Sequence, residues 1–277
     1  MYRRILVPVD GSPCGERAAA TAVAFAARLG AGVVFTFVLR ERYARMPSSE
    51  EAGQRARALG QALLERWERD GSDLPGGAGS RFVEGGDVAA TIVQTAHSES
   101  CDLVCMGTHG REGLPRLLLG SVAERITRLA GVPVLLDRGA ADRPRTLQRI
   151  VVAVDGSEPS LLAARHAVGL ARSLGAALTL LHVVPEAPLP LDVMGVYVDA
   201  AEESVGRARQ AGQELLDGTL ARFPNLVATT RLIDAGGSRV GDAIARAAAE
   251  DGADLIVLGT HGRSGLDHLL LGSVAER

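Results

Sequence analysis

Short runs of apolar residues recur along the chain, separated by alanine-rich or polar stretches long enough to form helices. The clearest runs are Ile5–Asp10 and Ile150–Asp155, each followed by Gly-Ser. Strands that are apolar along both faces are typical of parallel sheets covered by helices on both sides. A serine then stands at the expected N-cap of a helix and a glycine just past its end. The first helix of the first half is therefore expected to follow Ser12 and run to about Leu29, closed by Gly30. Its counterpart is expected to follow Ser157 and to be closed by Gly175.

The remaining runs follow the same order in both halves, so that strands and helices alternate strictly. Such alternation favours right-handed βαβ crossovers and predicts an α/β fold with doubly wound parallel sheets. Later strands are expected at Val33–Leu39, Ser80–Glu84, Asp102–Met106 and Val132–Leu136, and at Leu178–Val184, Val227–Asp234 and Asp254–Leu258. Later helices are expected at Glu50–Asp70, from Gly85-Gly86-Asp87 to Ser98 and at Ser121–Ala130, and at Asp199–Phe223 and from Gly236-Gly237-Ser238 to Glu250.

An internal repeat divides the chain into two domains, which we place at residues 1–141 and 147–277, with a linker within Arg138–Gln148. The repeat is incomplete, because the second copy stops at Arg277, within its last expected helix. Its counterpart in the first copy continues through Ile126–Asp137 to a fifth strand. Either the given chain is truncated, which we favour, or the second domain lacks its last strand.

The strongest part of this repeat is a glycine-rich stretch, Gly107–Arg125, which returns as Gly259–Arg277. Sixteen of its nineteen positions are identical, and all four glycines of the loop are kept. Glycine is needed where the backbone takes a positive φ or passes close to a ligand. Each loop follows an apolar strand and leads into Ser-Val-Ala-Glu-Arg, which reads as the first turn of a helix. This arrangement binds phosphate through backbone N–H groups and the helix dipole, and it predicts two nucleotide loops.

The amino-acid composition of the chain excludes several classes of protein. The chain has 277 residues, of which 47% are hydrophobic and 23% charged, with a formal net charge of −3. Nucleic-acid binding is not expected, because it calls for a basic excess. No apolar run is long enough to span a bilayer and the N-terminus does not read as a signal peptide, so we expect a cytoplasmic protein without a membrane partner. All 30 basic residues are arginine, which excludes a P-loop lysine and Schiff-base chemistry.

Three cysteines are too few and too unevenly spaced for a disulfide framework or a zinc site. Cys101 and Cys105 bracket the strand before the first glycine-rich loop, and we interpret them as small core side chains. Cys14 is expected in the first turn of a helix, where a thiolate is favoured.

With these features assembled, the chain resembles a tandem universal stress protein. The resemblance covers nearly all of the sequence and depends on the family's ATP-binding pattern G-x₂-G-x₉-G-[ST]. It is strengthened by the Asp-Gly-Ser that ends the first strand of each half. The pattern is matched by Gly107, Gly110, Gly120 and Ser121, and by Gly259, Gly262, Gly272 and Ser273.

The resemblance implies a strand order of 3-2-1-4-5, with ATP across the carboxyl ends of strands 1 and 4. It implies the same set of contacts in each half: an aspartate beside ribose, phosphate or a nucleotide-bound Mg²⁺, a valine at adenine, an apolar base pocket and phosphate-binding amides. The implied ATP-binding residues are Asp10, Val38, Met106, Gly107, Gly110, Gly120, Ser121 and Val122, and Asp155, Val183, Leu258, Gly259, Gly262, Gly272, Ser273 and Val274. One departure from the pattern of the first half is Ala153, which stands where that half has Pro8.

Several alternatives stay open at this stage. Asp10 and Asp155 could each cap the following helix in place of, or besides, contacting the ligand or Mg²⁺. His109 and His261 lie inside the loops, where they could act as acid or base or simply orient the loop. We expect nucleotide binding and signalling, with pairing through a sheet edge, either in a homodimer or between the two domains. The competing hypotheses are slow ATP hydrolysis or autophosphorylation, and an ATP-free dimerisation module.

Overall fold

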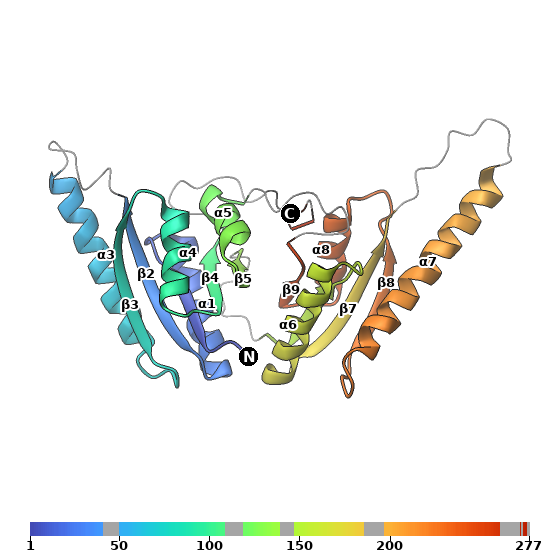
Figure 1. Ribbon diagram of the computed structural model, residues 1–277, viewed down its shortest axis with the longest axis horizontal. Helices are drawn as coiled ribbons and strands as arrows, with labels where there is room; N and C mark the ends of the chain where they lie inside the picture. The colour runs from blue at the N-terminus through green and yellow to red at the C-terminus, as the bar shows by residue number, and fades with distance from the viewer. Residues whose placement is uncertain are drawn as a thin grey trace. The chain divides into compact units, whose positions relative to one another are not determined.

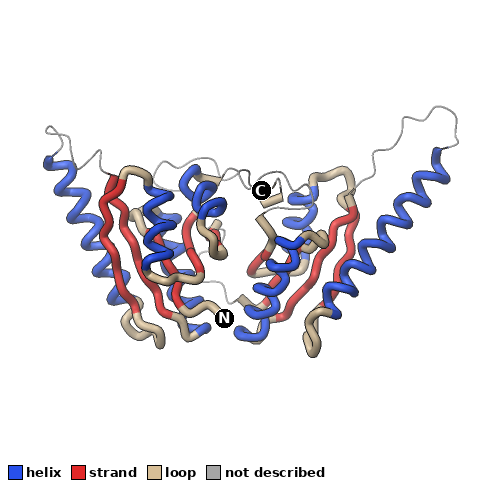
Figure 2. Tube along the Cα trace, viewed as in Figure 1, coloured by secondary structure: helices blue, strands red, loops and turns tan. Residues whose placement is uncertain are grey.

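The chain folds into two compact units, Met1–Arg145 and Thr146–Arg277, which we call the first and the second half (Figure 1). They are seen in a computed structural model that describes residues 1–40, 50–108, 119–138, 147–185 and 197–260, together with Gly272, Val274 and Ala275. Each half is a parallel sheet with helices packed on both faces, as the strands and helices of Figure 2 show. The predicted α/β fold is therefore confirmed.

The sheet of the first half has five strands in the order β3-β2-β1-β4-β5, all parallel. This is the order that the resemblance implied. The strands are β1 (Arg4–Pro8), β2 (Gly32–Arg40), β3 (Ala78–Gly85), β4 (Leu103–Gly107) and β5 (Val134–Asp137). The helices are α1 (Pro13–Leu29), α3 (Glu50–Asp70), α4 (Val88–Ser98) and α5 (Ser121–Leu129).

Side chains alternate between the two faces of this sheet. Leu6, Val34 and Val104 point to the face where α4 and α5 lie side by side, and there they form a buried cluster with Ile92 and Ile126. The other face is covered by α1 and α3. Because both faces are buried, the central strands need apolar residues at every position, which explains the continuous runs in the sequence.

The described part of the second half repeats this arrangement with four strands in the order β8-β7-β6-β9. Its strands are β6 (Arg149–Ala153), β7 (Ala177–Val184), β8 (Thr229–Asp234) and β9 (Leu255–Val257), and its helices are α6 (Glu158–Leu174), α7 (Tyr197–Ala221) and α8 (Val240–Glu250). Among the described helices of the chain, none combines the length and the apolar character needed to cross a membrane.

Local signals set the first helix of each half as the sequence predicts. Ser12 is the N-cap of α1 and its side chain accepts a hydrogen bond from the backbone N–H of Gly15, while Gly30 ends the helix in the left-handed conformation. Ser157 and Gly175 play the same parts for α6. Substitution of such an N-cap costs about 0.5–2 kcal/mol in stability, so these serines are structural residues in their own right.

The helices α4 and α8 begin differently from each other. Asp87 is the N-cap of α4, and its carboxylate accepts hydrogen bonds from the backbone N–H groups of Ala89 and Ala90. The N-cap of α8 is Arg239, which makes no side-chain cap. The helix expected to open at Gly236-Gly237-Ser238 is present and ends at Glu250, as predicted, and the hydroxyl of Ser238 donates back to the carbonyl of Ala235.

Cys101 and Cys105 are buried in the first half, as expected for core side chains. Burial raises the pKa of Cys101 to about 11 and raises the pKa of Cys105 as well. Both thiols are therefore protonated at neutral pH and contribute to the core as small apolar groups.

Candidate functional site

The order in which the chain adds strands to the first sheet reverses between β1 and β4. The chain passes from β1 through α1 to β2 on one side, and it returns through α4 to β4 on the other side. Ligands of open parallel sheets bind in the crevice outside the carboxyl ends of the strands at such a switch point. The segments that begin there are Val9–Ser12, after β1, and the stretch that starts at Thr108, after β4. In the second half, β6 and β9 are related in the same way.

The turn after the first strand has the same geometry in both halves. Gly11 and Gly156 have φ values of 76° and 84°, which an L side chain rarely adopts. The Asp10 carboxylate accepts a hydrogen bond from the backbone N–H of Ser12 at 2.9 Å. In the second half the Asp155 carboxylate accepts from both the backbone N–H and the hydroxyl of Ser157, at 2.9 and 2.6 Å. One oxygen of each aspartate thus stabilises its own turn, and contact with a ligand stays a prediction.

Gly107 makes a close approach, but the neighbour is a helix of the same half. A Cβ atom at this position would lie 2.8 Å from the backbone C and O atoms of Cys14 and 2.8 Å from its Sγ atom. Cys14 in turn lies with its Sγ atom 3.6 Å from the carbonyl oxygen of Asp137. The absence of a side chain at Gly107 therefore has a packing reason that is independent of any nucleotide.

The glycine-rich loop is closed by the same hydrogen bond in both halves. The backbone N–H of Gly120 donates to the carbonyl of Thr108 at 2.8 Å, and that of Gly272 donates to the carbonyl of Thr260 at 2.8 Å. Gly110, Gly262 and Ser273, like the two loop histidines, lie outside the described residues, so their predicted roles are not tested.

The closing glycine also begins a helix. Gly120 is the N-cap of α5 with φ −65° and ψ 145°, and no side chain caps the first turn that starts at Ser121. The N–H groups of a first helical turn have no partner within the helix. A first turn without a side-chain cap is an arrangement that can bind an anion, and phosphate binding at α5 stays a prediction.

Three of the predicted ATP-binding residues come together on one face of the first sheet. Met106 belongs to the buried cluster under α4 and α5, and Val38 and Val122 pack against that cluster. In the second half, Val183 is part of the equivalent cluster and Val274 packs against it. Leu258 and Gly259 follow directly after β9 and are partly buried. These residues form an apolar wall in each half, and its contact with a nucleobase stays a prediction.

A pocket of about 390 Å³ adjoins this wall in the first half. It lies at the carboxyl ends of β2 and β3, between the first turns of α4 and α5. Its lining residues are Arg40, Gly86, Asp87, Val88, Ala89, Ser121, Val122 and Arg125. Of these, the sequence predicted only Ser121 and Val122 as ligand contacts.

The charged residues of the pocket were missed. Arg125 forms a bidentate ion pair with Asp87, with N–O distances of 3.0 and 2.6 Å. These hydrogen bonds lower the pKa of the Asp87 carboxyl, so it is ionised at neutral pH. The two halves differ at these positions: Pro185 stands where the first half has Arg40, and Arg239 is the N-cap of α8 as Asp87 is the N-cap of α4.

The donor set fits a nucleotide better than a metal ion held by the protein alone. In the described ranges no three His, Cys, Asp or Glu side chains gather as metal ligands. Mg²⁺ usually keeps several waters and takes one or two carboxylates together with the phosphates of a substrate. Asp10 and Asp155 could supply one carboxylate each in that way. The uncapped turn of α5 is suited to the phosphates of a nucleotide and the apolar wall to its base. The guanidinium group of Arg40 is suited to its negative charge.

Comparison with known proteins gives matches to one family. The model of the universal stress protein family matches residues 1–138 and again residues 146–277. A universal stress protein of Mycobacterium tuberculosis is 29% identical over 282 residues, covering 98% of this chain and 92% of the relative. A universal stress protein structure from Archaeoglobus fulgidus has a TM-score of 0.67 at 18% identity, over 99% of this chain and 92% of its own, and shares the fold. Another universal stress protein, solved in complex with cAMP, covers 49% of this chain and 97% of its own with 25% identity and a TM-score of 0.36.

Proposed function

The chain belongs to the universal stress protein family, and from this premise we propose that each half binds one molecule of ATP and that occupancy is a signal in the stress response. ATP would lie across the carboxyl ends of the first and fourth strands. Its phosphates would contact the glycine-rich loop and the first turn of the next helix, and its base the apolar wall. Asp10 and Asp155 would be the single carboxylate ligands for a Mg²⁺ ion that arrives with the nucleotide.

The observation that supports this proposal most strongly is the uncapped first turn of α5. Ser12, Asp87 and Ser157 cap their helices with side chains, whereas the turn that begins at Ser121, like the first turn of α8, is left without such a cap. It directly follows the closing hydrogen bond of the glycine-rich loop, from Gly120 to Thr108. Backbone donors at a helix N-terminus are suited to the phosphates of a nucleotide.

Binding is proposed in preference to turnover. Phosphoryl transfer needs a metal clamp, a base and further positive groups placed together. The chain has no lysine, and no acidic cluster that could clamp a metal is found among the described residues. Hydrolysis and autophosphorylation on Ser121 or Ser273 are therefore outcomes that the experiment below distinguishes from plain binding.

For the cellular setting, we propose that the protein acts in the cytoplasm and pairs through a sheet edge. In the first half that edge is β5, whose four residues are all partly exposed. An edge strand presents unpaired backbone groups that another strand can complete. The partner edge would belong to a second copy or to the other half of the chain.

The test is the identity and number of bound nucleotides. The protein is purified and denatured, and the released nucleotides are separated by HPLC, with ATP, ADP, AMP and cAMP as standards. ATP is expected, because the site is proposed to bind without turnover, whereas ADP in its place would indicate hydrolysis. Protein without nucleotide, and no binding of ATP at about 1 mM by calorimetry, would contradict the proposal.

Two matched variants assign the sites. Gly110→Glu and Gly262→Glu each place a carboxylate where phosphate is expected, so each should abolish binding in its own half and leave the other half intact. The double variant should bind none. If both single variants keep the full stoichiometry of the unmodified protein, the loops are not the nucleotide sites.

A further inference from the structure

Asp137, the last residue of β5, contacts two other parts of the first half. The Thr21 hydroxyl, on α1, donates to the Asp137 carboxylate with an oxygen–oxygen distance of 2.6 Å. The backbone carbonyl of Asp137 accepts from the backbone N–H of Thr108, directly after β4, at 3.3 Å. The Sγ atom of Cys14, in the first turn of α1, lies 3.6 Å from the same carbonyl oxygen. Asp137 thus joins α1 and the residue that follows β4 to the end of β5.

Thr108 is the residue at which the glycine-rich loop of the first half both begins and closes. Its N–H donates to Asp137, and its carbonyl accepts the closing hydrogen bond from Gly120 at 2.8 Å. Gly120 is also the N-cap of α5, so the position of Thr108 affects the position of the first turn of this helix. Hydrogen bonds therefore connect Thr21, through Asp137 and Thr108, to the turn at which we propose that phosphate binds.

The strand that supplies this carbonyl is short and lies at the edge of the sheet. β5 has four residues, all of them partly exposed, and it follows β4 as the last strand in the order of the sheet. Asp137 is paired with Gly107 at the end of the β4–β5 ladder. Elements with few buried contacts and exposed hydrogen bonds open locally at little cost. A hydrogen bond from a hydroxyl to a carboxylate is among the stronger ones, so Thr21 anchors the end of this strand.

We infer that Asp137 is a positioning residue for the nucleotide site of the first half: anchored by Thr21, it holds Thr108 so that the glycine-rich loop is closed before the nucleotide arrives. This inference rests on the proposed function and deepens it. A loop that is already ordered binds its ligand more tightly, because less conformational entropy is lost on binding. Loss of the anchor therefore weakens nucleotide binding even where the protein stays folded.

Hydrogen exchange tests the link in the absence of nucleotide. The amide of Gly120 should exchange about three- to tenfold faster in Asp137→Ala and in Thr21→Val than in the unmodified protein, because the loop opens more often. The amide of Val9, which donates to the carbonyl of Thr36 between β1 and β2, is the internal reference and should change less. Asp137→Asn keeps a side-chain oxygen that accepts from the Thr21 hydroxyl, so it should restore the slow exchange of Gly120 to within about twofold.

Titration calorimetry with ATP tests the consequence for binding. Gly262→Glu is the background for all variants, because it leaves the first half for measurement. On this background Asp137→Ala and Thr21→Val should each raise the dissociation constant for ATP about three- to tenfold, and Asp137→Asn should raise it less than about twofold. The double variant of Asp137→Ala with Thr21→Val should bind no more weakly than the weaker single variant, because both substitutions remove the same contact.

Glu99→Gln is the matched control for a loss of stability alone. Glu99 lies at the end of α4, and its carboxylate accepts from Arg4 on β1 and Arg81 on β3. Its substitution should make the first half easier to unfold in urea, but it should leave the dissociation constant for ATP unchanged. A purely structural role of Asp137 predicts the same behaviour for Asp137→Ala.

The outcomes separate the inference from the proposed function. The inference is overturned, and the proposed function stands, if ATP binds and Asp137→Ala affects it no more than Glu99→Gln does. It is also overturned if the exchange of Gly120 in Asp137→Ala rises no more than that of Val9, or if Asp137→Asn is as impaired as Asp137→Ala. If the protein with an unmodified first half binds no ATP there, the proposed function fails for that half and the inference fails with it.

Discussion

At Gly107 the space for a side chain is already occupied by the first turn of α1. A Cβ atom would lie 2.8 Å from two backbone atoms of Cys14, and backbone atoms cannot rotate away as the end of a side chain can. Gly107→Ala should therefore shift β4 or α1 and lower the free energy of unfolding by about 1–3 kcal/mol. Urea unfolding in the absence of nucleotide measures this cost.

Gly79→Ala provides the control for this substitution. Gly79 lies on β3, and a Cβ atom there would meet no other atom within 4 Å. Its replacement should change stability by no more than about 0.5 kcal/mol. If Gly107→Ala is equally harmless without nucleotide, the packing explanation is wrong and the glycine is kept for another reason.

At the residue scale, the sequence is informative where a contact is local. The N-cap at Ser12 could be predicted because its hydrogen bond, from the backbone N–H of Gly15, spans only three residues. The contact of Gly107 with Cys14 and the ion pair of Asp87 with Arg125 join residues that are far apart in the chain. Such contacts depend on the register of the strands and on helix placement, which residue patterns do not specify.

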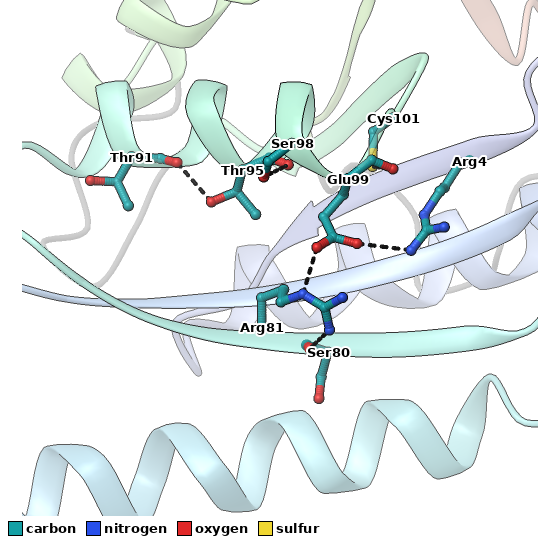
Figure 3. A network of polar contacts seen from close by, with 8 residues as sticks. All are labelled: Arg4, Ser80, Arg81, Thr91, Thr95, Ser98, Glu99 and Cys101. Atoms are coloured by element: carbon teal, nitrogen blue, oxygen red, sulfur yellow. Dashed lines mark hydrogen bonds and ion pairs between the residues drawn. The ribbon is translucent and has the colours of Figure 1, made fainter.

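At the scale of elements, Glu99 ties the end of α4 to two strands (Figure 3). Its carboxylate accepts from Arg4 at the start of β1 at 2.9 Å and from Arg81 on β3 at 2.5 Å. Its side chain is only 14% exposed, unlike that of an ordinary surface ion pair. The second half repeats the link, with Arg231 on β8 paired to Asp251 at the end of α8. The network links α4 to β1 and β3 away from the carboxyl ends of the strands, where the nucleotide site is proposed.

Glu99→Gln should destabilise the first half, because it leaves two guanidinium groups without their counter-charge. The expected loss is about 1–3 kcal/mol in the free energy of unfolding. Glu51→Gln is the control, since the Glu51–Arg55 pair lies on an exposed face of α3, and it should cost no more than about 0.5 kcal/mol. Equal effects of the two substitutions, measured by urea unfolding, would show that the network adds nothing beyond a surface pair.

The order and type of the elements could be predicted from the sequence, but their ends are set partly by neighbours. Capping residues fixed the limits of the first helices, as at Ser12 and Gly30. The strand expected from Val227 begins only at Thr229, because Asn225 has a positive φ of 62° and Val227 is 95% exposed, away from the sheet. An apolar run therefore does not by itself show where pairing with a neighbouring strand starts.

At the scale of the whole molecule, the two halves differ in how well their fourth strands are covered. In the first half β4 lies between β1 and β5, and Leu103, Val104 and Cys105 are at most 3% exposed. In the described part of the second half β9 pairs only with β6, and Ile256 on β9 is 37% exposed. Each apolar side chain that is fully buried contributes about 1.5–3 kcal/mol, so this difference affects the stability of the halves.

Fragments that consist of residues 1–141 and of residues 147–277 test both the proposed domain boundary and this difference. Each should fold alone, because each half has its own sheet and its own buried cluster. The second fragment should melt about 10 °C or more below the first, since a few kcal/mol correspond to a shift of that size in a domain of this length. Circular dichroism follows the melting, with the full chain expected to show both transitions.

A fragment 1–141 that stays unfolded would refute the boundary. A fragment 147–277 that melts at the same temperature as the first or above it would show that the exposed edge at β9 costs the second half little.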